Sequence, residues 1–241
     1  MTMQAGWHPV ALSVSVEPGT SAGTRLAGNE LVVWRDNNGA AHVWEDRCPH
    51  RGMKLSFGFV RGDHIACLYH GWQYDTAGQC RYIPAHPDLR VPQSITASVY
   101  STVEAAGMIW TALDQSAALP ELPALPQEEV PVRSLYLDSS AGAVMEVVKT
   151  MPPTPFSGGP VVANLAALGE TLFSLTVGED TLLLGLQDLS GGRSALHVVI
   201  DGPAARYAGR GQAHFLAWTA ELRYHFELER AAGATSMTQA A

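Results

Sequence analysis

The chain has 241 residues, of which 46% are apolar and 16% are charged, so it can bury a core and is not a disordered polymer. Its formal net charge of -8 argues against nucleic acid or an anionic membrane as the main partner, because both require basic patches. No apolar run is long enough to span a bilayer, and Met1–Pro9 lacks the basic and apolar stretches of an export signal, so a cytoplasmic location is expected.

Residues 6 to about 115 alternate short strand-like runs with turn signals, which predicts a small antiparallel β domain. The clearest signal is Asp36–Gly39, a turn between two apolar runs that predicts a β-hairpin. Those runs and the other expected strands are Leu31–Trp34, Ala41–Trp44, Ile65–Cys67, Trp72–Tyr74, Ser98–Val103 and Gly107–Ala112, with a further turn at Asp75–Gly78.

A proline-rich connector follows this domain. Leu119–Pro126 holds three prolines in eight residues, which favours an extended and semi-rigid segment. We therefore expect a first domain over residues 1–116, a linker over 117–131 and a second domain over 132–241.

The second domain is predicted to be a small α+β unit with an antiparallel sheet and a closing helix. Phe215, Trp218, Leu222 and Phe226 recur at helical spacing, and the tail from Ala231 is expected to fray. The other expected elements are a strand at Val132–Asp138, a helix at Ala141–Lys149, a loop at Met151–Pro160, and strands at Thr171–Val177, Thr181–Gln187 and Arg193–Ile200. The whole chain is predicted to be mainly β with α.

Two short runs carry the chemistry: Cys48-Pro-His50 and, after sixteen residues, Cys67-Leu-Tyr-His70. Each run offers one thiolate and one imidazole, and two such runs on facing hairpin tips can hold a [2Fe-2S] cluster, with both sulfurs on one iron and both nitrogens on the other. A Cys2His2 zinc site is the alternative interpretation. Gly52 and Gly71 are expected to allow the sharp turns that such loops need.

The remaining cysteine and the nearby histidines carry less weight. Cys80 is left over from the two runs, so a disulfide framework is not expected, and it is interpreted as an inert thiol. His42, His64 and His86 are interpreted as surface residues.

The flanking residues resemble the Rieske domain of the Rieske non-haem iron oxygenases. The resemblance implies that Cys48 and Cys67 ligate one iron and that His50 and His70 ligate the other, with the exposed edge of each imidazole as the electron exit. The segments that carry it are Gly6–Val10, Glu45–Gly52, Leu68–Trp72, Asp75–Gly78, Ile83–Pro84 and Gly107–Trp110.

Departures from the respiratory Rieske branch imply a low reduction potential. Met53 and Tyr69 stand where that branch carries two bridging cysteines, and Trp72 stands where it carries a hydroxyl residue. Fewer hydrogen-bond donors near the sulfides predict a potential of roughly -150 mV rather than +300 mV.

The second domain does not show the family's mononuclear iron motif, an Asp-x2-His-x4-5-His run on a helix. Ala141–Lys149 contains no histidine, and the histidines after the linker are His197, His214 and His225. On one straight helix His214 and His225 would lie about 16 Å apart. We interpret this part as a shortened, reduced helix-grip-like catalytic domain from which the mononuclear iron is absent.

These features predict an electron-transferring oxidoreductase component with no catalytic residues of its own. It would take electrons from a reductase or ferredoxin and pass them to a partner oxygenase subunit in a trimer or mixed assembly, and its acidic charge fits a basic face on a redox partner. One alternative is a complete mono- or dioxygenase that holds iron through His197, His214 and a carboxylate such as Asp188 or Asp201. A non-catalytic redox-sensing subunit is the other.

Overall fold

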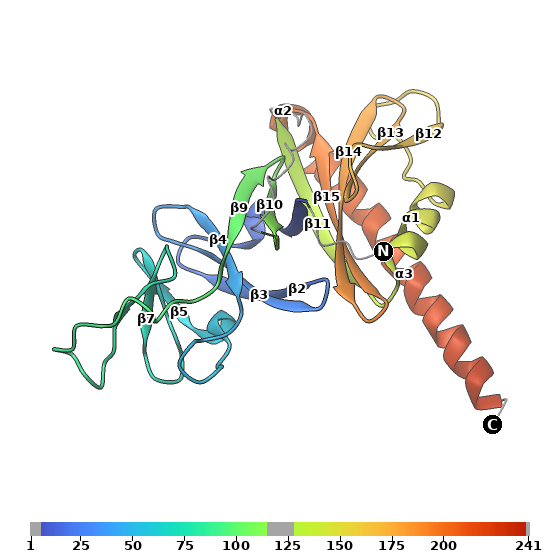
Figure 1. The fold of residues 1–241 in the computed structure, drawn as a ribbon. Coiled ribbons are helices and arrows are strands. Elements are labelled where there is room, and N and C mark those ends of the chain that lie inside the picture. Colours follow the sequence, from blue (N-terminus) through green and yellow to red (C-terminus); the bar gives the residue numbers. More distant parts are fainter. Residues whose placement is uncertain (1–5, 115–127, 240–241) are drawn as a thin grey trace. The chain divides into compact units, whose positions relative to one another are not determined.

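The computed structural model describes residues 6–114 and 128–239 of the chain, which divides into two compact units, Met1–Leu122 and Pro123–Ala241. Figure 1 follows the chain through both units. Most of the predicted linker, residues 117–127, lies outside the described residues.

The described part of the first unit is built from two antiparallel sheets (Figure 1). The larger sheet has the order β1-β10-β9-β4-β3-β2, and the smaller has the order β5-β6-β7-β8. The strands are β1 (His8–Leu12), β2 (Ser21–Leu26), β3 (Asn29–Arg35), β4 (Ala41–Glu45), β5 (Phe59–Arg61), β6 (His64–Ala66), β7 (Gln73–Asp75), β8 (Cys80–Tyr82), β9 (Val99–Ala105) and β10 (Met108–Ala112). Single 3-10 turns lie at Ser13–Ser15 and Leu55–Phe57.

Two hairpin turns use the same device, as the turn signals in the sequence predict. Asp36 accepts hydrogen bonds from the N–H groups two and four residues later, at 2.9 and 3.0 Å. Asp75 does the same at 2.9 and 3.0 Å. Gly39 and Gly78 follow with φ values of 92° and 81°, a conformation that costs little only for glycine.

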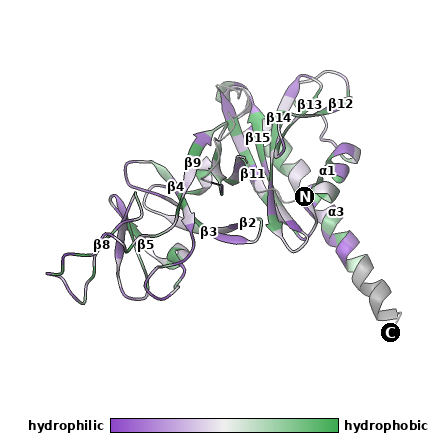
Figure 2. Cartoon of the chain, in the orientation of Figure 1, coloured by the Kyte–Doolittle hydropathy of each residue, from purple (hydrophilic) through white to green (hydrophobic). Residues whose placement is uncertain are grey.

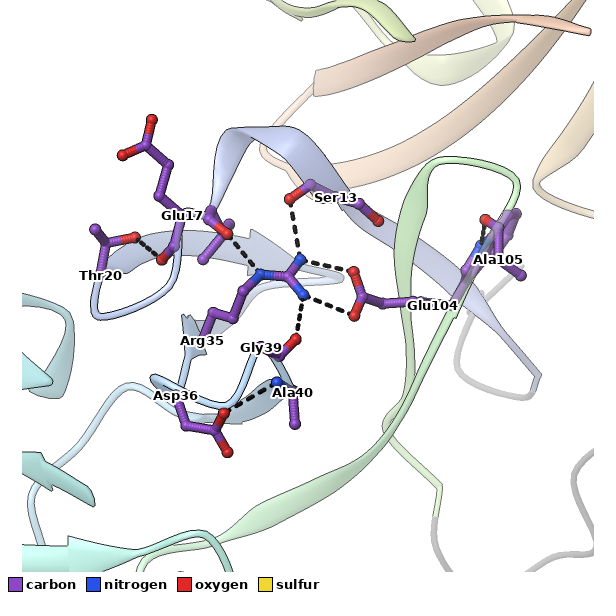
Figure 3. Close-up of polar contacts among 11 residues, drawn as sticks. Ser13, Glu17, Thr20, Arg35, Asp36, Gly39, Ala40, Glu104 and Ala105 are labelled. Atoms are coloured by element: carbon purple, nitrogen blue, oxygen red, sulfur yellow. Dashed lines mark hydrogen bonds and ion pairs between the residues drawn. The ribbon is translucent and has the colours of Figure 1, made fainter. Parts of the chain in front are cut away.

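A buried arginine ties four segments of the first unit together (Figure 3). Arg35 donates to the carbonyl oxygens of Val16, Gly39 and Ser13 at 2.7, 2.7 and 3.0 Å. It also donates to both carboxylate oxygens of Glu104, at 2.8 and 2.6 Å. All five N–H donors of the guanidinium are therefore used, which lets the charge be buried.

Two apolar clusters fill the first unit. One lies within the larger sheet and includes Leu31, Val33 and Ile109. The other joins that sheet to the smaller one through Trp34, Trp44 and other buried side chains. Its remaining buried members are Val32, Cys48, Leu55, Ile65, Cys67, Tyr74, Cys80, Ile83 and Ala97. The candidate thiols therefore lie in a packed core.

The second unit has one five-stranded antiparallel sheet with the order β11-β15-β14-β13-β12 among its described residues. Hydrophobic stretches run along its strands, green in Figure 2. The elements are β11 (Glu129–Leu137), α1 (Ala141–Thr150), β12 (Ala163–Ala167), β13 (Leu172–Val177), β14 (Asp180–Ser190), β15 (Arg193–Asp201), α2 (Ala204–Tyr207) and α3 (Arg210–Gln239).

The helices α1 and α3 cover one face of this sheet. Phe215, Trp218, Leu222 and Phe226 of α3 all lie in its core, which confirms the periodicity seen in the sequence. Alternate residues of β14 and β15 meet them from the sheet. The predicted fold class is confirmed: the chain is mainly β, with antiparallel sheets and a C-terminal helix.

Some element boundaries differ from the prediction. The tail from Ala231 was expected to fray, and this is wrong, because α3 continues to Gln239. Alanine is the best helix former, and the single Gly233 costs only about 1 kcal/mol in a helix. β11 begins at Glu129, earlier than expected, and β12 was not predicted. None of the described helices has the length and apolar character needed to cross a membrane.

Candidate metal centre

The first candidate ligand loop follows β4 and folds back on Cys48. The Cys48 N–H donates to the carbonyl of Met53 at 2.8 Å, and the Gly52 N–H donates to the carbonyl of Cys48 at 2.8 Å. Gly52 has a φ of 74°, in the left-handed region that favours glycine. His50 therefore lies within a tight turn whose two ends are bonded to each other.

The second loop joins β6 to β7 and repeats this scheme. The Cys67 N–H donates to the carbonyl of Trp72 at 2.9 Å, and the Gly71 N–H donates to the carbonyl of Cys67 at 2.9 Å. Gly71 has a φ of 69°, and a Cβ there would lie 3.0 Å from the side chain of Pro84. Both glycines thus have the conformational role that the sequence predicts.

The two cysteines form a buried pair of sulfurs. Cys48 is 2% exposed and Cys67 is 3% exposed. Burial raises the pKa of the Cys67 thiol, and the adjacent Cys48 sulfur raises it further, whereas hydrogen bonds from the backbone N–H groups of Tyr69 and His70 lower it. A bound iron would outweigh these effects, because a coordinating thiol is deprotonated.

The two histidines form a second pair, nearer the surface. The ring centroids of His50 and His70 are 4.7 Å apart. Trp72 stacks on His50 at 4.1 Å, and Tyr69 stacks on His70 at 3.8 Å, so aromatic neighbours orient both imidazoles. Partial burial, the charge of His70 and the charge of Arg51 lower the pKa of His50, which favours the neutral ring that can bind a metal.

This arrangement in two pairs fits a binuclear centre. One iron of a Rieske cluster takes two thiolates and the other takes two imidazoles, so each iron needs only one pair. A tetrahedral zinc ion needs all four donors around one point. Within residues 6–114 and 128–239, no three His, Cys, Asp or Glu side chains are grouped so that they could hold one metal ion.

One polar neighbour of the sulfurs was missed in the sequence. The hydroxyl of Tyr74 lies 3.1 Å from the Sγ of Cys48, and both groups are buried. Burial, followed by the hydrogen bond to Cys48, raises the pKa of Tyr74, so the phenol stays protonated and can donate to a thiolate. The signal was present, since the alternation of β7 turns Tyr74 inward and a buried tyrosine hydroxyl needs a partner.

The other candidates of the first unit are only partly as predicted. His42 is not a surface residue: it is half-buried, stacks on Trp34 and lies 3.2 Å from Asp36. His86 is exposed. Cys80 is buried, and burial raises the pKa of its thiol, which agrees with an inert role.

In the second unit, both ring nitrogens of His197 are hydrogen-bonded to neighbouring side chains. Its Nδ1 lies 2.7 Å from the hydroxyl of Ser134, and its Nε2 lies 2.9 Å from the side-chain oxygen of Gln187. Complete burial lowers the pKa of His197 to about 4, so the ring is neutral. Nε2 then donates to Gln187 and Nδ1 accepts from Ser134, which leaves neither nitrogen for a metal.

The other two histidines of this unit have separate neighbours. The Nε2 of His214 lies 2.8 Å from the carbonyl oxygen of Thr154, and the Nε2 of His225 lies 3.3 Å from Glu229. Both histidines lie on α3, whereas His197 lies in β15.

The carboxylates proposed to complete an unconventional iron site are also placed elsewhere. Asp188 accepts the N–H of Ser190 at 2.7 Å, at the end of β14. Asp201 ends β15. Among the described residues, the structure does not bring His197, His214 and either aspartate into a group that could hold a metal ion.

Comparisons with known proteins bear on the first unit most strongly. Residues 6–94 match the family described as the Rieske [2Fe-2S] domain. The oxidoreductase NdmD of Pseudomonas putida is 37% identical over 110 residues, which are 45% of this chain and 19% of that protein. The 3-chlorobenzoate-3,4-dioxygenase oxygenase subunit of Comamonas testosteroni is 35% identical over 145 residues, which are 57% of this chain and 34% of that protein. The matched segments therefore span about a fifth and a third of these two relatives.

The structure of NdmA from Pseudomonas putida CBB5 matches with a TM-score of 0.69 at 22% identity, covering 94% of this chain and 80% of that one. At this identity the match shows a shared fold, and it extends over both units. Residues 6–94 are therefore a Rieske [2Fe-2S] domain, and the chain is a relative of the Rieske non-haem iron oxygenases.

Proposed function

We propose that this chain is an electron-transferring component of a Rieske oxygenase system. The observation that carries the proposal is the pairing of two buried thiols with two outward imidazoles on loops of the same construction. Cys48 and Cys67 would hold one iron, and His50 and His70 the other. The [2Fe-2S] group bound there supplies one-electron redox chemistry at low potential.

The surrounding residues bury one side of this centre and expose the other. The sulfur side faces the core, whereas His70 is exposed and His50 is partly exposed. Trp72 and Tyr69 hold the two rings by stacking, so the exposed imidazole edges keep a defined orientation. Electrons would arrive from a reductase or ferredoxin, and leave for a partner oxygenase subunit, across this edge.

The contacts of the second unit support electron transfer over oxygenation by this chain alone. Helix α1, where the family's iron motif would begin, carries Glu146 and Lys149 joined by an ion pair at 2.5 Å and has no histidine. His197 is held on both ring nitrogens by neighbouring side chains. We therefore propose that the mononuclear iron is supplied in trans, within a trimer or mixed assembly.

A complete oxygenase with unconventional ligands is the second candidate. It is favoured by the likeness to NdmA, which covers both units and not only the Rieske domain. It would need ligands other than the predicted set, since those histidines and aspartates lie apart.

Metal analysis separates the two candidates. The purified 241-residue chain is expected to contain two irons and two sulfides, and its reduced form to give the EPR signal of a Rieske cluster. A reproducible third iron, with substrate turnover by this chain and a reductase, would contradict the proposal. A single zinc per chain would remove both candidates. His70→Cys serves as a spectroscopic control, because a third thiolate should change the EPR signal without removing the loops.

A further inference from the structure

The surface next to the candidate cluster exposes apolar side chains. Tyr69 is 61% exposed and Leu68 is 47% exposed, and both belong to the second ligand loop beside the exposed His70. Large exposed apolar side chains that lie together are typical of a contact surface. A protein that touches them would also reach the imidazole edge.

Two arginines of the first ligand loop are exposed and have no carboxylate partner among the described residues. Arg47 and Arg51 flank the first Cys-Pro-His run, and neither takes part in an ion pair, whereas Lys54 lies 2.8 Å from Glu30. The side chain of Arg47 lies close to the loop, because a Cβ built at Gly52 would lie 3.5 Å from its Nε, an ordinary van der Waals contact. These charges are therefore free to bind an external anion.

The arginines line a hollow of about 370 Å³ beside the ligand loop. Glu45 is the acidic residue of its lining, and it already accepts a hydrogen bond from Ser98 at 2.9 Å. Two guanidinium groups against one carboxylate give the hollow a net positive charge, although the chain as a whole carries -8. The lining residues are Glu45, Arg47, Cys48, Pro49, His50, Arg51, Gly52, Thr96 and Ser98.

We infer that this surface docks an acidic electron-carrier protein, whose carboxylates enter the hollow between Arg47 and Arg51 while its apolar contacts rest on Leu68 and Tyr69. The inference rests on the proposed function and names the charge of the partner. It reverses the expectation from net charge, because docking depends on the charge at the contact and a charge more than about 8 Å away is largely screened at physiological salt. Guanidinium groups bind carboxylates in a paired, directional way.

Docking would bring the carrier's redox group to the exposed imidazoles. The reduced carrier would give up one electron and become oxidised, and the [2Fe-2S] group that Cys48, Cys67, His50 and His70 would hold supplies the acceptor for that electron. The arginines take no part in this exchange. They raise the local concentration of the carrier and set its orientation.

The test measures the reduction of the intact, cluster-loaded chain by a reduced acidic plant-type ferredoxin in a stopped-flow instrument at several ionic strengths. The rate constant of the natural protein should fall as salt rises. Arg47→Glu with Arg51→Glu should lower it about tenfold to a hundredfold at low salt and flatten the salt dependence. The dissociation constant of the complex with oxidised ferredoxin should rise in the same double variant. Calorimetry measures this constant without any electron transfer.

Two controls make the result specific. Arg61→Glu makes a like charge change at the far end of the β5–β6 hairpin from Cys67, and it should leave the rate within about twofold of the natural protein. The methyl viologen radical cation should reduce the double variant at least as fast as the natural protein, which shows that the cluster is intact. Unchanged ferredoxin kinetics in the double variant would overturn the inference, and so would a ferredoxin that never reduces a viologen-reducible cluster. Neither result would alter the iron count that tests the proposed function.

Discussion

Replacing Tyr74 by phenylalanine removes one hydroxyl and should lower the reduction potential of the cluster. The hydroxyl lies 3.1 Å from the Sγ of Cys48, and Tyr74 is completely buried. Because the pKa of Tyr74 is raised, the phenol is protonated at neutral pH and can only donate to a thiolate. Phenylalanine retains the buried ring, so the change is confined to one hydrogen bond.

The size of the effect follows from the charge that reduction adds. The donor stabilises the reduced, more negative form better than the oxidised form, and hydrogen bonds of this kind contribute about 1 kcal/mol. For one electron, 59 mV corresponds to about 1.4 kcal/mol, so the potential of Tyr74→Phe should fall by about 40 mV. The burial of both partners keeps water from replacing the lost donor.

A redox titration followed by EPR or circular dichroism measures this shift. Tyr82→Phe is the matched control, since Tyr82 is exposed on the neighbouring strand β8, and its potential should change by less than about 10 mV. A cluster that keeps its EPR signal in Tyr74→Phe, with a potential equal to or above that of the natural protein, would refute the reasoning. The absolute value is predicted at roughly -150 mV.

Four further predictions concern stability. Arg35→Met should reduce the free energy of unfolding by about 2 to 3 kcal/mol, because it leaves Glu104 and three carbonyls without their donor. Urea unfolding measures this change, and a loss below about 0.5 kcal/mol would contradict the prediction. The pKa of Glu104 is lowered, chiefly by its hydrogen bond from Arg35, so its contribution to the free energy of unfolding is present above pH 4.5 and is lost as the pH falls through the lowered pKa. Glu104→Gln should therefore lose less of its free energy of unfolding over the same pH range. The pKa of His197 falls to about 4, so below pH 6.5 the unfolded state binds a proton that the folded state does not. The free energy that protects β14 and β15 against hydrogen exchange should therefore fall by about 3 kcal/mol between pH 7 and 4. His197→Gln should abolish this pH dependence. Gly78→Ala should destabilise the protein far more than Gly39→Ala. A Cβ at Gly78 would lie 2.7 Å from a side chain and 2.8 Å from a carbonyl oxygen, whereas a Cβ at Gly39 would meet nothing within 4 Å. Equal urea midpoints for the two variants would refute this prediction.

Local signals in the sequence were sufficient to predict the two candidate loops and most helices and strands. Each loop is defined by a few neighbouring residues: a Cys-x-His or Cys-x2-His spacing and the glycine that follows it. The structure gives both loops the same backbone hydrogen bonds. The turn at Asp36–Gly39 and the helical repeat of Phe215, Trp218 and Leu222 are local in the same sense. Such features could be predicted because the interactions that make them span only a few residues.

Contacts between distant segments were decided only by the tertiary structure. Arg35 meets Glu104 across 69 positions, Ser134 meets His197 across 63, and Tyr74 meets Cys48 across 26. The sequence contains each of these residues, but it does not show which partner satisfies a buried donor or charge. That choice depends on strand register and on the packing of whole sheets, so the tuning of the sulfurs, the neutrality of His197 and the positive hollow beside His50 emerge only when the chain is folded.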